Sequence, residues 1–132
     1  MQDPWNPTSA ELMAWAYDRN STWPEQDWDL AVTSDHNGQL LLQLALDTTC
    51  PKREFFLRCL YLFVGDAVRS GFVAHRRDAV VELLNSVPSG PTPEISRWLA
   101  RSQDLIDADR SAVDYTLWCD GGYSRAEQSP AD

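Results

Sequence analysis

The sequence predicts an all-α protein, a compact bundle of six or seven helices arranged as antiparallel hairpins. Apolar residues recur at helical spacing through most of the chain, and helix-start signals precede these segments. No stretch shows the sustained alternation of apolar and polar residues that is typical of a half-buried strand. Hydrophobic residues make up 43% of the 132 residues, which is enough to form a core.

The first predicted helix begins after Thr8 and ends near Asp18. Thr8 and Glu11 have the capping-box spacing, in which each side chain binds the backbone N–H of the other residue. A second, short helix is predicted to begin at Pro24, because proline suits the first helical turn and acidic residues follow it. A strand over 28–33 is the alternative, because that stretch partly alternates.

Two strongly apolar helices are predicted next, over residues 39–48 and about 52–70. The shorter helix has a polar stripe at Gln39, Gln43 and Asp47. The longer helix has a polar stripe at Glu54, Arg58, Tyr61, Gly65 and Arg69. A helix that is apolar around most of its circumference packs on several sides, so we expect helix 52–70 to be central.

Three more helices are predicted in the second half of the chain, over 76–87, 93–106 and about 111–119. The first has an apolar stripe at Val80, Leu83, Leu84 and Val87. Thr92 and Pro93 mark the start of the next as its N-cap and first helical residue. Its expected inner face is Ile95, Trp98, Leu99, Leu105 and Ile106.

The short connections between these helices favour antiparallel neighbours. The pair 39–48 and 52–70 is followed, about 40 residues on, by the pair 76–87 and 93–106, and this spacing also fits HEAT-like pairing. We expect a single helical domain over residues 1–122 and a flexible polar tail over 123–132.

The chain is expected to be soluble and cytoplasmic. Its first residues lack the basic and apolar regions of a signal peptide. Its longest apolar run is far shorter than the roughly 20 residues of a membrane-spanning helix. The three cysteines, which include no C-x-x-C spacing, are interpreted as small buried side chains.

The net charge is −9, from 20 acidic and 11 basic residues. Non-specific nucleic-acid binding needs a basic surface, and anionic membranes attract basic segments. The charge therefore argues against both nucleic acid and membrane, and it favours a protein partner of opposite charge. The sequence leaves the oligomeric state open.

No motif for catalysis, nucleotide binding or metal binding stands out. The two histidines, His36 and His75, are expected to be exposed near helix starts, and nucleophile-elbow and phosphate-loop patterns are absent. Residues 107–111 begin like a calcium loop, but Ala112 and Trp118 stand where that loop requires glycine and glutamate. We expect no catalytic residue, no cofactor and no metal.

Asp66 is the candidate buried acid. It shares one face of the long helix with apolar residues at Phe55, Cys59 and Leu62. A buried carboxylate needs a partner, for which the candidates are Arg69, Arg97 and Arg101. A structural ion pair is the simpler interpretation, and an acid–base group in an inter-helical cleft is the alternative.

The candidate partner-binding residues lie where tryptophan and acidic residues are most densely mixed, at Trp23, Asp27, Trp28, Asp29 and Asp35. Tryptophan is a favoured interface anchor, and neighbouring acidic side chains attract a basic partner. The alternative is that these tryptophans fill the core and the acidic residues form a solvated rim.

The sequence thus favours a non-enzymatic, acidic protein–protein interaction module, for example an immunity protein or antitoxin that binds a basic partner. The alternative is a small helical enzyme or ligand-binding protein that uses Asp66 and an arginine in an inter-helical cleft.

Overall fold

The computed structural model describes residues 7–21, 32–33, 37–69, 76–107 and 118. Within these ranges the secondary structure is entirely α-helical, as predicted. The described helices are α1 (Ser9–Tyr17), α3 (Gly38–Leu46), α4 (Arg53–Arg69), α5 (Arg76–Asn85) and α6 (Pro93–Asp107).

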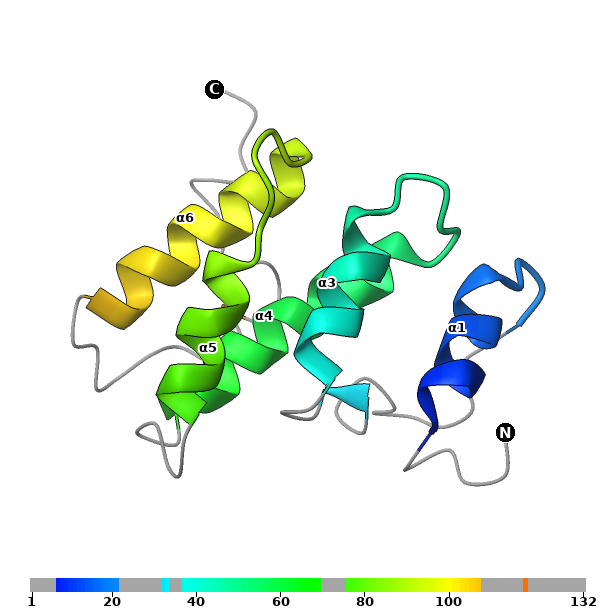
Figure 1. Ribbon diagram of the computed structural model, residues 1–132, viewed down its shortest axis with the longest axis horizontal. Helices are drawn as coiled ribbons and strands as arrows, with labels where there is room; N and C mark the ends of the chain where they lie inside the picture. Colours follow the sequence, from blue (N-terminus) through cyan, green and yellow to red (C-terminus); the bar gives the residue numbers. More distant parts are fainter. Residues whose placement is uncertain (1–6, 22–31, 34–36, 70–75, 108–117, 119–132) are drawn as a thin grey trace.

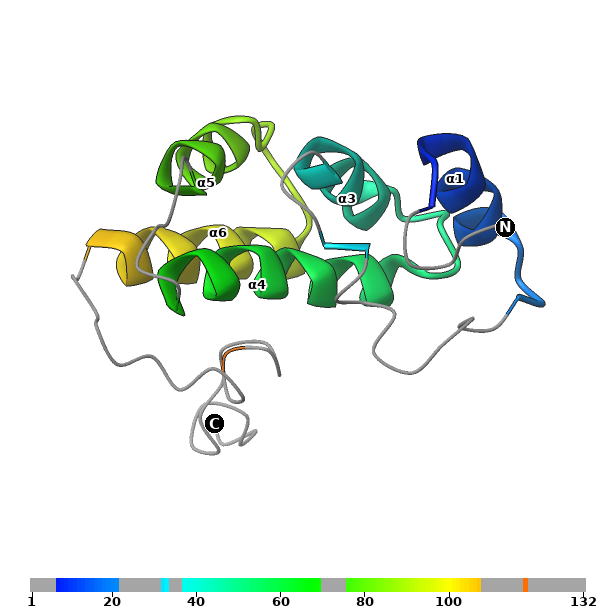
Figure 2. The same cartoon turned by 90° about the horizontal axis from the view of Figure 1, so that it is seen from below.

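The helices form two layers (Figures 1 and 2). One layer contains α1, α3 and α5, and the other contains α4 with α6 beside it. Helices α4 and α6 run in the same direction, and α5 returns in the opposite direction between them in the chain. This arrangement places one face of α4 against the other layer and another face against α6.

Helix α4 is the centre of the fold, as its apolar sequence predicts. Eleven of its 17 residues are buried. It contacts α3, α5 and α6, and the Trp15 ring of α1 packs edge-on against Phe55 and Phe56, with centroids 4.9 and 6.0 Å apart. Burial of this much apolar surface is the main favourable contribution to folding.

The predicted helix starts are confirmed at α1 and α6. Thr8 Oγ1 accepts a hydrogen bond from Glu11 N at 3.1 Å, and Glu11 Oε1 accepts one from Thr8 N at 3.0 Å. At α6, which begins at Pro93, Thr92 Oγ1 accepts from Ile95 N at 3.4 Å. Both caps satisfy N–H groups that have no partner within the helix itself.

The predicted polar stripe of α4 is wrong at Tyr61 and Gly65, which are both buried. Trp118 lies against them: its ring centroid is 5.2 Å from that of Tyr61, and its Nε1 donates to the Tyr61 carbonyl at 2.6 Å. A Cβ atom on Gly65 would lie 2.4 Å from Trp118 Cδ1. The glycine is therefore a contact point for an indole ring, whereas the sequence pattern suggested a solvent-facing position.

The predicted number of six or seven helices is not confirmed, and neither is HEAT-like pairing. The helices expected over 24–32 and 111–119 lie outside the described residues, apart from Val32 and Trp118, as does the tail over 123–132. The alternative strand over 28–33 is likewise outside, except for its last two residues.

Candidate functional site

The predicted partner-binding residues all lie outside the described part of the chain. Four of them belong to residues 22–31, which we call the acidic tryptophan segment, and Asp35 follows shortly after. The structure describes the residues that flank this segment, Ser21 on one side and Val32 on the other. The contacts of these flanking residues show how the core holds the two ends of the segment.

A lysine holds the chain just before the acidic tryptophan segment. Lys52 Nζ donates to the Trp15 carbonyl at 2.9 Å, to Ser21 Oγ at 2.6 Å and also to the Asp18 carbonyl. The same ammonium lies 4.6 Å from the centroid of the Trp15 ring. A cation at the carbonyl end of α1 is favourable because the helix dipole is negative there. Sequence reasoning missed this contact, although Lys52 is the only lysine of the chain.

A buried asparagine holds the chain just after the segment. The Val32 side chain is fully buried, and its carbonyl accepts a hydrogen bond from Asn37 Nδ2 at 2.9 Å. Asn37 is itself 6% exposed, so this bond is shielded from water. The described residues on either side of the acidic tryptophan segment are therefore each bound by a side chain: Ser21 by one 31 residues away and Val32 by one five residues away.

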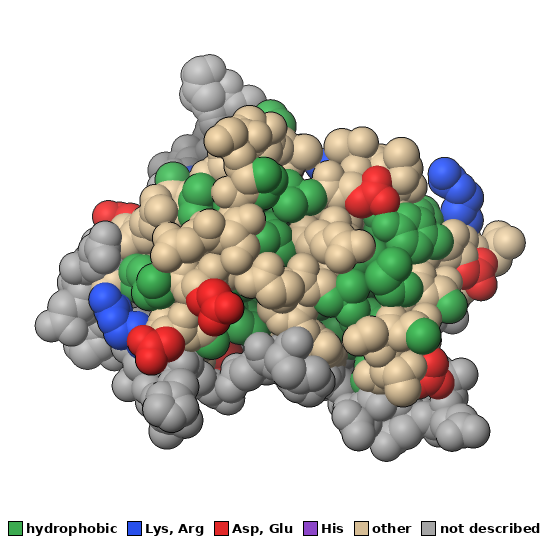
Figure 3. All heavy atoms as spheres, viewed as in Figure 1, with side chains coloured by type: hydrophobic (Ala, Val, Ile, Leu, Met, Phe, Trp, Pro, Cys, Tyr) green, Lys and Arg blue, Asp and Glu red, His purple; other side chains and the backbone are tan. Residues whose placement is uncertain are grey.

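The charges of the described residues nearly balance. The described residues carry ten acidic and nine basic side chains, so they are close to neutral. The remaining residues carry ten acidic and two basic side chains. Figure 3 shows acidic and basic side chains at several separate places on the face formed by α1, α3 and α5.

Tyr17 and Asp47 connect α1 to the end of α3. Tyr17 Oη donates to Asp47 Oδ2 at 2.6 Å, and Asp47 Oδ1 also accepts from Thr49 Oγ1 and Thr49 N at 2.7 and 2.9 Å. The hydrogen bond to Asp47, with smaller effects of burial and of the carboxylate charge, raises the pKa of Tyr17 from 10.0 to about 12. The hydrogen bonds from Tyr17 and then from Thr49 lower the pKa of Asp47.

These pKa shifts predict how the contact responds to pH. Tyr17 binds its proton more tightly in the folded state, so its stabilising contribution is full below pH 10 and is lost as the pH rises to about 12. Asp47 contributes above its ordinary pKa of 3.8, and its contribution is lost as the pH falls through the lowered folded-state value. We expect an alkaline absorbance titration of tyrosinate to show one group near pH 12 that is missing in Tyr17→Phe.

The control for this titration is Asp47→Ala, in which the pKa of Tyr17 should return towards 10.0. Tyr17 is 41% exposed, so the return reflects the lost hydrogen bond and charge more than a change in burial. A wild-type Tyr17 that ionises at its ordinary pKa would contradict the contact.

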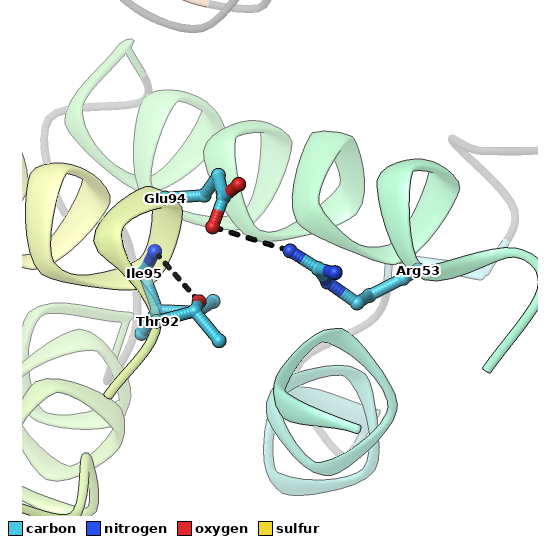
Figure 4. Close-up of polar contacts among 4 residues, drawn as sticks. All are labelled: Arg53, Thr92, Glu94 and Ile95. Carbon is cyan, nitrogen blue, oxygen red and sulfur yellow. Dashed lines mark hydrogen bonds and ion pairs between the residues drawn. The ribbon is translucent and has the colours of Figure 1, made fainter. Parts of the chain in front are cut away.

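An ion pair joins the first turns of α4 and α6 (Figure 4). Arg53 Nη2 lies 3.1 Å from Glu94 Oε2, and the two side chains are 28% and 48% exposed. The pKa of Glu94 is lowered, first by its own backbone N–H and less by the charge of Arg53. An ion pair this exposed contributes little to stability. We interpret it as part of the scaffold.

Asp66 is not a buried acid. Its side chain is 42% exposed, and its Oδ1 lies 3.7 Å from Arg69 Nη2 on the same helix. Leu62, one turn earlier on the same face, is buried, whereas Asp66 lies in the last turn of α4 and is partly exposed. The geometry matches the simpler interpretation of an ion pair, formed at the surface.

The described residues include two cysteines and no histidine. Among them, no group of three or more histidine, cysteine, aspartate or glutamate side chains could hold a metal ion. Cys50 and Cys59 are buried thiols, and burial raises the pKa of Cys50, which lowers its reactivity. Both histidines lie outside the described ranges.

In the same ranges, every helix is too short or too polar to cross a membrane. Comparison of the chain with models of known protein families, with curated proteins and with solved structures finds no match.

Proposed function

We propose that this protein is a non-enzymatic interaction module that binds a basic protein partner through the acidic tryptophan segment and Asp35. The observation that carries the proposal is the charge distribution. Residues 22–35 carry four acidic side chains, two tryptophans and no basic side chain, in a chain whose net charge is −9. Complementary charge accelerates association and disfavours partners of like charge.

The attachment of both ends of the segment also supports this role. Lys52 and Asn37 hold the residues that flank it at Ser21 and Val32. A scaffold that fixes the chain on either side of a binding segment reduces the entropy lost on association. A small acidic inhibitor of a basic enzyme, such as an immunity protein or antitoxin, is one form of such a module.

The alternative of a small enzyme or ligand-binding protein depends on Asp66 in an inter-helical cleft. The exposure of Asp66 and its pairing with Arg69 give that alternative no support.

We expect Asp29→Arg to reduce capture of a basic partner by at least tenfold, because it reverses a charge within the acidic tryptophan segment. The matched control is Glu82→Arg, which makes the same change of charge at an exposed position of α5 and should leave capture nearly unchanged. Immobilised wild-type and variant proteins are incubated with extract of the native host at low and at high salt, and captured proteins are identified by mass spectrometry.

Support requires one basic protein that is retained at low salt, lost at high salt and lost with Asp29→Arg alone. Equal loss in both variants would indicate general charge attraction and would contradict a specific site. Trp28→Ala tests whether tryptophan also contributes to partner binding. Weakened capture by a folded variant indicates an interface anchor, whereas unfolding of the variant indicates a core residue.

A further inference from the structure

Two buried polar atoms of α6 have no protein hydrogen-bond partner in the described structure, Trp98 Nε1 and Ser102 Oγ. Both side chains are 0% exposed. They lie one helical turn apart on a buried stripe that begins at Ile95 and ends at Leu105. Residues four apart on a helix are neighbours on the same face.

The sequence explains why these two groups need a partner. The indole N–H can only donate a hydrogen bond, and the serine hydroxyl can donate or accept one. Buried polar groups of native proteins are nearly always bonded to protein or to ordered water, because an unbonded group loses its hydration without compensation. Serine at a fully buried helix position is therefore unfavourable unless its hydroxyl is bonded.

We propose that α6 holds an internal water-binding site, in which one water molecule accepts a hydrogen bond from Trp98 Nε1–H and bonds to Ser102 Oγ. Water suits this pair because both groups are neutral, are enclosed and differ in hydrogen-bonding character. Globular proteins contain about one buried water per 27 residues, so a chain of 132 residues should hold several. Arg101 Nε is also buried, but Arg101 has other partners, and the site rests on the two neutral groups alone.

The sign of the effect of Ser102→Ala on stability tests the site. If water links the two groups, removal of the hydroxyl leaves the water and the indole N–H poorly bonded, and the unfolding equilibrium constant rises about tenfold. If no water contacts the hydroxyl, Ser102→Ala removes an unbonded buried polar group, and the unfolding equilibrium constant stays the same or falls. The matched control is Ser96→Ala, an exposed position of the same helix with the same change in helix propensity.

The unfolding constants are measured by urea denaturation, and the effect of Ser102→Ala is taken relative to that of Ser96→Ala. An unchanged or lowered relative constant overturns the proposal. A second measurement on the wild-type protein does not depend on the folding of a variant. Magnetisation transfer from water to the Trp98 indole proton should reveal a long-lived direct contact, with the resonance assigned in the wild-type protein from its proximity to protons of Ile95 and other α6 residues. Absence of that contact also overturns the proposal.

Discussion

Replacing Gly65 with alanine is expected to expel the Trp118 indole from α4 and to destabilise the protein by about 1–3 kcal/mol. The added Cβ would lie 2.4 Å from Trp118 Cδ1 and 2.8 Å from Trp118 Nε1, which is too close for either atom to stay in place. Expulsion would also break the 2.6 Å hydrogen bond from Trp118 Nε1 to the Tyr61 carbonyl. Urea denaturation measures the stability, and quenching of tryptophan fluorescence by iodide reports the new exposure of the ring.

A double-mutant cycle separates this clash from the intrinsic effect of alanine. In a Trp118→Ala background nothing opposes the Cβ of Ala at position 65, and alanine is a better helix former than glycine by about 1 kcal/mol. Gly65→Ala should therefore change sign and stabilise the protein in that background. Equal effects of Gly65→Ala in the two backgrounds would show that Trp118 does not occupy this position on α4.

Lys52→Met is expected to destabilise the protein by about 2 kcal/mol, because hydrogen bonds from a charged donor are stronger than neutral ones. Methionine keeps much of the aliphatic contact with the Trp15 ring but loses the three oxygen acceptors that Lys52 Nζ binds at the end of α1. The acceptors are only partly buried, so water replaces some of the lost bonding, and this moderates the effect. Urea denaturation followed by circular dichroism measures the loss of stability in Lys52→Met.

The matched control is Arg53→Met, which removes a cation from the adjacent position. Arg53 forms an exposed ion pair with Glu94, so its loss should change the stability by less than about 1 kcal/mol. If the two variants were equally destabilised, the effect of Lys52→Met would come from charge or helix propensity at this turn. The hydrogen bonds to α1 would then contribute nothing specific.

Local signals in the sequence were the most dependable. The capping box of Thr8 and Glu11 and the Thr92–Pro93 start depend on residues within one turn, so spacing alone identifies them. The central position of α4 follows from composition, since a helix with so few polar residues must be covered on several sides.

The candidate site was harder to predict, because its contacts join residues that are far apart in the chain. Lys52 binds a carbonyl 37 residues away, and Trp118 binds one 57 residues away. Neither residue has a local motif that indicates its partner.

The periodicity of α4 predicted exposure of Tyr61 and Gly65 and burial of Asp66, and all three expectations failed for the same reason. Helical spacing groups residues by face, but it does not say which neighbour covers that face at each turn.

The helical class, the starts of α1 and α6, the central apolar helix and the excess of negative charge could be predicted from the residues alone, because these depend on nearest neighbours along the chain or on composition. The fold, and not the local pattern, buries Tyr61 and Gly65 beneath Trp118 and leaves Asp66 exposed. It also decided that a lysine and an asparagine hold the two ends of the acidic tryptophan segment. The lysine contacts form because packing of the core brings together segments that are 31 to 37 residues apart in the chain, and no local motif specifies them.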